Sequence, residues 1–211
     1  MSLQLWIANI NYSSWSLRPW FLLKALNIPF DEQLATFVPG GSSYEKFLRF
    51  SPSGLVPCLV TADTTVWDSL AICEYIAEDY PHVWPQEKTA RAWARSAAAE
   101  MHSGFTTLRR ECPLNCSESR PAAEMTPELQ KECQRLDKIW CEGLTRFGGP
   151  WLAGENISAA DAFYVPVALR ARTYQLPFSA AAQTWIDRIL AHPAIIEWCE
   201  AAAKEAKIDH D

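Results

Sequence analysis

A proline at the start of an apolar run constrains the first part of this chain more than any other feature. The segment SPSGLVPCLV at 51–60 contains Pro57, which has no backbone N–H to donate to a sheet. Pro57 must therefore open a strand rather than lie inside one, and the apolar residues through Val60 predict that this strand is buried. Residues 63–65 predict a hairpin turn, and 66–67 the return strand.

Asp68 and Ser69 follow this hairpin and predict the start of a helix, since the apolar residues after them keep helical spacing. A helix N-terminus offers free N–H groups and a positive dipole end to a carboxylate, and Asp68 can accept from an ammonium group. The alternative is that the two residues only cap the helix. A cis Val56-Pro57 bond would turn the backbone of Val56 toward a peptide-like ligand, but only about 5–6% of X-Pro bonds are cis.

The N-terminal segment predicts a strand, a helix and a second strand. Apolar and other residues alternate over 3–8, a helix with Pro19 in its first turn runs to Asn27, and 30–36 predict the second strand. A crossover of this length implies parallel pairing. With a short helix at 44–50, the order of elements is typical of a thioredoxin-like domain.

Two prolines within residues 81–85 mark a linker, so we expect an α/β domain at 1–80 and an all-helical domain at 86–211. The second domain begins with a helix predicted over Gln86 to Arg110. Ser158 lies three residues before Asp161, a capping-box spacing that predicts a partly buried cap. The other predicted helices span 126–148, 159–169 with a kink at Pro166, 180–190 and 193–204.

Composition narrows the class of protein. Apolar residues make up 49% of the 211 residues, which excludes a disordered chain. The net charge of −6 disfavours nucleic acid as a partner. No apolar run approaches the roughly 18 residues of a membrane span, and the N-terminal residues lack an export signal, so we expect a cytoplasmic protein with no membrane partner. Seven cysteines without an export signal predict reduced thiols, and dispersed histidines predict no metal site.

The segment around Pro57 resembles the glutathione-binding half of the cytosolic glutathione transferases. In that family a Val-Pro pair is cis and binds the cysteinyl backbone of glutathione, and an acidic-Ser pair binds its γ-glutamyl end. The resemblance assigns these roles to Val56, Pro57, Asp68 and Ser69.

A second motif extends the resemblance to nearly the whole chain. Gly154 followed by the Ser158 and Asp161 box matches the run into the central helix of the family's C-terminal domain. The resemblance implies a thioredoxin-like domain followed by an all-α domain, glutathione as co-substrate and a homodimer. In that dimer the first domain of one subunit would pack on residues 86–110 of the other.

The reactive group of such a domain lies between the first strand and the first helix. Here the candidates are Ser13, then Ser14, then Tyr12, and the segment 12–16 contains no cysteine. In the family's serine members, a hydroxyl hydrogen-bonds the glutathione thiolate. Lowering a thiol pKa of about 8.5 by two units needs about 2.7 kcal/mol, and one hydrogen bond to a charged group supplies about 1.5–3 kcal/mol. The alternative is that both serines only cap the helix.

Other site residues follow less directly. In the family, a Lys, Gln or His before the Val-Pro pair often binds the glycyl carboxylate of glutathione. This chain has Gly54-Leu55 at that position. We therefore expect Lys46, Arg18 or a cation from the second domain to bind this carboxylate. The electrophile pocket should lie between the domains. His102 and Arg109, seven residues apart, are predicted to share a helix face beside it. The residues expected to line this pocket are Trp15, Met101, Phe105 and Arg109.

These features predict a serine-type, zeta- or theta-like bacterial glutathione S-transferase that activates the thiol of glutathione for attack on a small hydrophobic electrophile. Two alternatives stay open. The serine-rich turn is similar to that of the zeta class, which implies an isomerase of the maleylacetoacetate type. The fold also occurs as a non-catalytic binding module, although such modules can lose the acidic-Ser pair or the hydroxyl.

Overall fold

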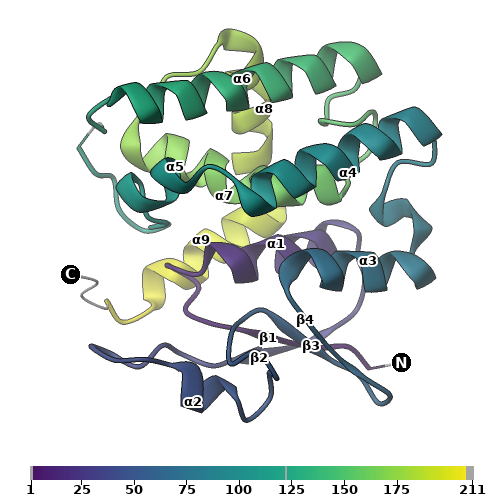
Figure 1. Ribbon diagram of the computed structural model, residues 1–211, viewed down its shortest axis with the longest axis vertical. Coiled ribbons are helices and arrows are strands. Elements are labelled where there is room, and N and C mark those ends of the chain that lie inside the picture. Colours follow the sequence, from purple (N-terminus) through teal and green to yellow (C-terminus); the bar gives the residue numbers. More distant parts are fainter. Residues whose placement is uncertain (1, 122, 208–211) are drawn as a thin grey trace.

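A four-stranded sheet forms the base of the molecule in the computed structural model, which describes residues 2–121 and 123–207 (Figure 1). The strand order is β2-β1-β3-β4. Strand β1 (Gln4–Ile7) pairs in parallel with β2 (Asp31–Leu34) and antiparallel with β3 (Cys58–Val60), which pairs antiparallel with β4 (Thr65–Trp67). The parallel pair and the terminal hairpin are those predicted for a thioredoxin-like domain.

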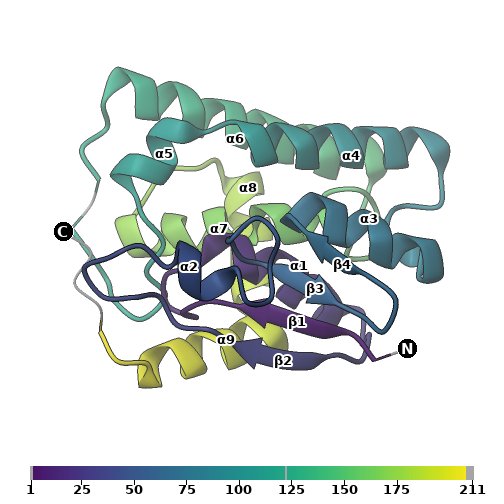
Figure 2. The ribbon, with the colours of Figure 1, turned by 60° about the horizontal axis from the view of Figure 1, so that its bottom comes forward.

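Alternation along β1 gives the sheet two buried faces. Leu5 and Ile7 belong to the main core, whereas Trp6 and Ala8 belong to a smaller cluster around Phe47. Helices α1 (Ser14–Ala25) and α3 (Ser69–Asp79) cover the first face, and the short α2 (Tyr44–Phe47) covers the second. Figure 1 shows α2 below the sheet and α4 to α8 above it, and Figure 2 shows α2 in front of the sheet when the bottom of the molecule is turned forward.

Helix α1 begins earlier than predicted. The side chain of Ser13 accepts a hydrogen bond from the Ser16 N–H and caps the helix, so Pro19 lies inside α1 rather than in its first turn. Pro19 is tolerated because its fixed φ suits a helix, although it leaves one carbonyl of the preceding turn without an intrahelical donor. The N-cap residue of α1 is therefore Ser13, which the sequence also indicates as the first candidate for the catalytic hydroxyl.

The helix predicted over Gln86 to Arg110 is wrong in one respect: the structure contains two helices there, α4 (Lys88–Ser103) and α5 (Thr106–Glu111). Phe105 adopts a left-handed conformation with a φ of 58° between them. The carboxylate of Glu132 then accepts from the N–H groups of Thr107 and Leu108, at 3.2 and 2.7 Å. These bonds cap the first turn of α5 and stabilise the break.

The remaining helices follow the predicted caps. Thr126 caps helix α6 (Pro127–Phe147), and α7 (Ala159–Tyr174) starts at the predicted capping box but runs past Leu169. Asp161 is fully buried, not partly buried as expected. The last helices, α8 (Ala180–Leu190) and α9 (Pro193–Lys204), have the predicted bounds.

Helix α7 joins the two parts of the molecule. It is buried on all sides and packs against α1 and α4, so α1 is enclosed between the sheet and the C-terminal helices (Figure 1). The short 3-10 helix η1 (Pro81–Val83) connects α3 to α4, within the predicted linker. The boundary itself stays a prediction. Within residues 2–121 and 123–207, no helix has the length and apolar character needed to cross a membrane.

Candidate active site

The loop between β1 and α1 places the serine hydroxyls at the N-terminus of a long buried helix. Ser13 and Ser14 are 5% and 7% exposed, so both lie just beneath the surface. The Ser13 hydroxyl donates to Oγ of Ser16 at 2.7 Å, and Oγ of Ser16 also accepts from the Ala8 N–H. The positive end of the α1 dipole and these hydroxyls favour an anion at this position.

Ser16 was not among the predicted site residues. Its hydroxyl lies one helical turn after Ser13 and is fully buried. The spacing Ser13-x-x-Ser16 is a sequence signal for such a pair, because the N-cap and third helical residues face one another. Ser16 therefore orients the Ser13 hydroxyl by accepting its hydrogen bond.

The Val56-Pro57 peptide bond is cis. Trp6 opposes Cys58 in the antiparallel pair of β1 and β3, so Val56 lies beyond the end of β3, beside the residues that lead from β1 toward Ser13. Val56 also packs against the small cluster that contains Ala8. The cis bond and the α1 N-terminus therefore occupy the same edge of the domain.

The N-terminus of α3 contributes the predicted acidic-Ser pair. Oδ1 of Asp68 accepts from the N–H groups of Leu70 and Ala71, at 2.8 and 3.4 Å, and caps the helix. Asp68 has a φ of 75°, a conformation that non-glycine residues rarely adopt and that costs about 1–3 kcal/mol. Ser69 is fully buried beside it. The helix cap uses only Oδ1 of Asp68 and leaves Oδ2 to other partners.

A hydrogen-bonded network connects this pair to the second part of the chain. Nη1 of Arg18 donates to Ser69 Oγ at 3.3 Å and lies 3.5 Å from Nδ1 of His102. Nε2 of His102 lies 3.3 Å from Oδ2 of Asp68. A neutral His102 with its proton on Nε2 satisfies both contacts, donating to Asp68 and accepting from Arg18. Burial lowers the pKa of His102, an effect that nearby Arg18 and Arg109 enhance and Asp68 opposes.

Trp15 lies among three cationic or ionisable groups. The guanidinium carbons of Arg18 and Arg109 are 4.1 and 4.9 Å from the centre of its ring, and the His102 ring meets it edge to face at 5.2 Å. Such contacts stabilise cations on an aromatic face. His102 and Arg109 thus meet at Trp15 even though they belong to different helices.

Arg18 is fully buried, and its Nε and Nη2 have no hydrogen-bond partner among the described residues. Burial, followed by the nearby cations Arg109 and Arg170, lowers the pKa of Arg18 to about 9, so the side chain keeps its charge at pH 7. A buried cation with unpaired donors is costly unless a ligand completes its contacts. From the sequence, Arg18 was one candidate for binding the glycyl carboxylate of glutathione. In the structure it lies beneath Ser69 and donates to its hydroxyl.

The other predicted site residues have different surroundings. Met101 is fully buried and Phe105 is 7% exposed, so both belong to the core and present little surface to a ligand. Arg109 donates to the backbone carbonyls of Gly104 and Met101. Lys46 donates to the backbone and hydroxyl oxygens of Thr36, and no described residue links it to Ser13 or Asp68. Its role toward glutathione stays a prediction.

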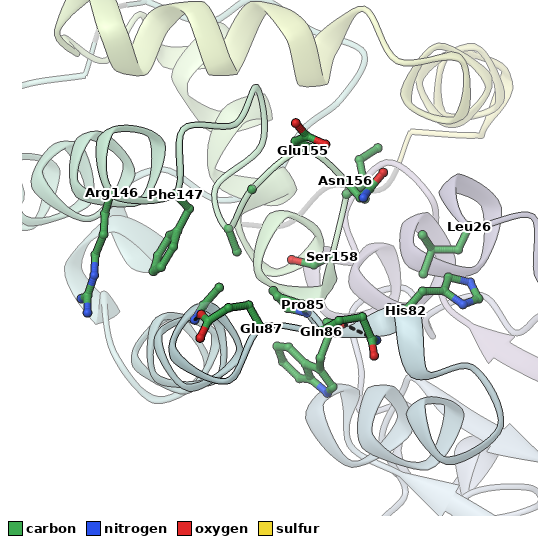
Figure 3. A pocket seen from close by; sticks show the side chains of 15 residues that line it. Leu26, His82, Pro85, Gln86, Glu87, Arg146, Phe147, Glu155, Asn156 and Ser158 are labelled. Atoms are coloured by element: carbon green, nitrogen blue, oxygen red, sulfur yellow. Dashed lines mark hydrogen bonds between the residues drawn. The ribbon is translucent and has the colours of Figure 1, made fainter.

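A separate cavity of about 720 Å³ lies at the opposite end of α1, where Leu26 faces the η1–α4 segment and the loop before α7 (Figure 3). Two of its polar side chains have local partners: Glu87 accepts from the Ala90 N–H, and Gln86 donates to the carbonyl of Pro81. The candidate catalytic residues lie elsewhere. Residues 2–121 and 123–207 contain no group of three or more His, Cys, Asp or Glu side chains that could hold a metal.

Both parts of the chain match families of known proteins. The family model of the glutathione S-transferase N-terminal domain matches residues 12–79, and that of the C-terminal domain matches residues 91–201. Human glutathione S-transferase theta-1 is 33% identical over 184 residues, covering 80% of this chain and 75% of that protein. Glutathione S-transferase GstB of Escherichia coli is 26% identical over 187 residues, covering 82% and 86%.

Solved structures show the same fold. A glutathione transferase homolog from Burkholderia, crystallised with bound glutathione, superposes with a TM-score of 0.70 at 21% identity, covering 97% of this chain and all of that one. A tau class enzyme from mango gives a TM-score of 0.72 at 20% identity, with 96% of each chain covered.

The fold and the site together define a thioredoxin-like domain with a hydroxyl at the start of its first helix, followed by an all-helical domain. The chain belongs to the glutathione S-transferase family.

Proposed function

We propose that this protein is a glutathione transferase in which Ser13 hydrogen-bonds the thiolate of bound glutathione. The observation that carries the proposal is the position of the Ser13 hydroxyl, at the N-cap of α1 and hydrogen-bonded to Ser16. When glutathione binds, the Ser13 O–H turns to the sulfur, and the Ser16 O–H can donate to Ser13 in its place. No general base is needed, because the thiol ionises to solvent at neutral pH once the thiolate is stabilised.

The remainder of the glutathione site follows from the surrounding residues. The backbone N–H and C=O of Val56, which lies beyond the end of β3 at the same edge of the domain as Ser13, would pair with the cysteinyl part of glutathione. Asp68 and Ser69, at the N-terminus of α3, would bind the ammonium and carboxylate of the γ-glutamyl part. Lys46 is our candidate for the glycyl carboxylate.

The second substrate would enter beside Trp15 and Arg109. We propose a small hydrophobic electrophile for this position and a role for the enzyme in detoxification in the cytoplasm. A panel of halonitrobenzenes, epoxides, peroxides and maleyl compounds, each tested with glutathione, identifies the reaction. Activity with disulfides alone would contradict the thiolate-transfer mechanism.

A second candidate function is a glutathione-dependent isomerase of the maleylacetoacetate type. The unpaired donors of Arg18 and the guanidinium of Arg109, both close to the Trp15 ring, would suit a substrate with a carboxylate. A zeta class glutathione S-transferase of Euphorbia esula is 27% identical over 161 residues. Isomerisation of maleyl compounds without net consumption of glutathione would favour this function over transfer.

A third alternative is a non-catalytic binding module, which would be favoured over both enzymes if the protein did not bind glutathione. Immobilised glutathione should retain the protein, and free glutathione at millimolar concentration should release it. Failure to bind would contradict the proposed site.

A further inference from the structure

The loop that carries Ser13 is held by a residue near the other end of the chain. Glu205 follows the last residue of α9, and its two carboxylate oxygens accept from consecutive backbone N–H groups of the loop. Oε1 lies 3.0 Å from the N of Ile10, and Oε2 lies 2.9 Å from the N of Asn11. A carboxylate that binds two successive amides through separate oxygens fixes the orientation of both peptide planes.

The same loop is anchored on its other sides by asparagine side chains. Oδ1 of Asn11, a residue only 3% exposed, accepts from the N–H groups of Cys116 and Ser117, at 2.8 and 3.0 Å. Oδ1 of Asn9 accepts from the Phe37 N–H at 2.7 Å. The loop therefore has little freedom while these contacts hold, and Glu205 supplies the contacts to its central amides.

The peptides of Ile10 and Asn11 lie within the turn that precedes Ser13, the residue with the proposed catalytic hydroxyl. The N–H groups of Tyr12 and Ser13 both donate to the carbonyl of Asn9, at 3.1 and 2.8 Å. These bonds close a turn around the peptides that Glu205 holds. A rotation of the peptides at Ile10 and Asn11 would change this turn and with it the direction of the Ser13 side chain.

Helix α9 also has contacts with α1 that do not involve Glu205. The rings of Trp20 and Trp198 meet at 4.7 Å, and Lys24 pairs with Glu197 at 2.7 Å, so α9 has its own contacts with α1. We therefore expect the two hydrogen bonds of Glu205 to act mainly on the conformation of the loop.

We propose that Glu205 is a positioning residue: it holds the loop so that the Ser13 hydroxyl faces the sulfur of bound glutathione. This inference rests on the proposed function of Ser13. Glu205 acts through the backbone of Ile10 and Asn11 and does not itself contact the reacting atoms.

The test compares Glu205→Ala and Glu205→Gln with the control Glu197→Ala, which removes a surface pair from the same helix. Hydrogen exchange without glutathione should be faster at the amides of Ile10 and Asn11 in Glu205→Ala. The bound thiol pKa should rise by about 0.5–1 unit, which lowers turnover at pH 6.5 about three- to tenfold with little change in glutathione affinity. The Gln variant, with one acceptor oxygen, should lie between wild type and Ala. Glu197→Ala should match wild type in every readout.

The double variant Ser13→Ala/Glu205→Ala separates the two proposals. If Glu205 acts through Ser13, its removal should raise the bound thiol pKa no further once the hydroxyl is absent. An unchanged thiol pKa and turnover in the Glu205→Ala single variant, in an enzyme that depends on Ser13, would overturn the positioning role alone. An enzyme whose bound thiol pKa is unaffected by Ser13→Ala would overturn both proposals. Thermal unfolding of each variant identifies any loss of activity that arises from lost stability.

Discussion

The Ser13 hydroxyl is the group on which the proposed chemistry depends. In Ser13→Ala the thiolate loses one charged hydrogen bond, so the pKa of bound glutathione should rise by about one to two units. Turnover at pH 6.5 should fall about ten- to a hundredfold and recover partly at higher pH, where the thiol ionises unaided. The thiolate absorbance of the enzyme–glutathione complex, titrated against pH, measures the shift.

Two other serines of the proposed site provide comparisons for that experiment. Ser14→Ala should retain activity, and Ser69→Ala should weaken glutathione binding with a smaller effect on the bound thiol pKa. Full activity of Ser13→Ala together with loss in Ser14→Ala would show that the register of the site is one residue later. If neither hydroxyl matters, the mechanism is wrong.

His102 predicts a pH dependence of stability. Burial lowers its pKa in the folded state, while the unfolded state keeps a value of about 6.5. The unfolded state therefore binds the proton first as the pH falls, so this contribution to stability is full above pH 6.5 and is lost as the pH falls through the folded pKa. Urea unfolding at pH 7.5 and pH 5 should show a smaller difference for His102→Gln than for wild type. An equal difference would place the pH dependence in other groups.

At the scale of an element, the start of α7 depends on Asp161. Its carboxylate accepts from the N–H groups of Leu152 and Ser158, at 2.9 and 3.0 Å, and from the Trp185 indole N–H at 3.0 Å. Asp161→Ala leaves these buried donors unpaired and should lower the free energy of unfolding by about 3–5 kcal/mol. Asp161→Asn retains the volume and one acceptor and should cost less.

The control for this prediction is the exposed Asp187 of α8, where an Ala substitution should change stability by less than about 0.5 kcal/mol. Chemical denaturation of the three variants measures the differences. Equal stability of Asp161→Ala and wild type would mean that the capping box does not hold the helix start.

At the scale of the whole molecule, we propose a homodimer in which the first domain of one subunit packs on α4 and α5 of the other. Trp67, on the edge strand β4, is 47% exposed, as is Ile196 on α9. An interface of this kind buries about 1,600 Å² or more. Light scattering should therefore give twice the chain mass, and Trp67→Ser should raise the dissociation constant, whereas Ile196→Ser should not. A monomer mass at all concentrations would exclude the dimer.

The sequence by itself determined the elements whose ends are set by nearby residues. Pro57 opening its strand, Asp68 capping α3, Thr126 with Pro127 starting α6, and the Ser158 box starting α7 all depend on contacts within a few positions. Hydrophobic periodicity then indicated whether each element is a helix or a strand, and the order of the elements predicted the fold. The resemblance to the family, rather than periodicity, pointed to Ser13 and Ser69 as candidate site residues, and in the structure each lies at a helix start.

The tertiary structure decided what distant residues bring together. The break between α4 and α5 depends on Glu132, more than twenty positions away, and Arg18 lies beneath Ser69 only because α1 and α3 pack side by side. Glu205 reaches the loop before Ser13 across almost the whole chain. Local periodicity contains no information about such contacts, because their partners are selected by packing of the complete fold.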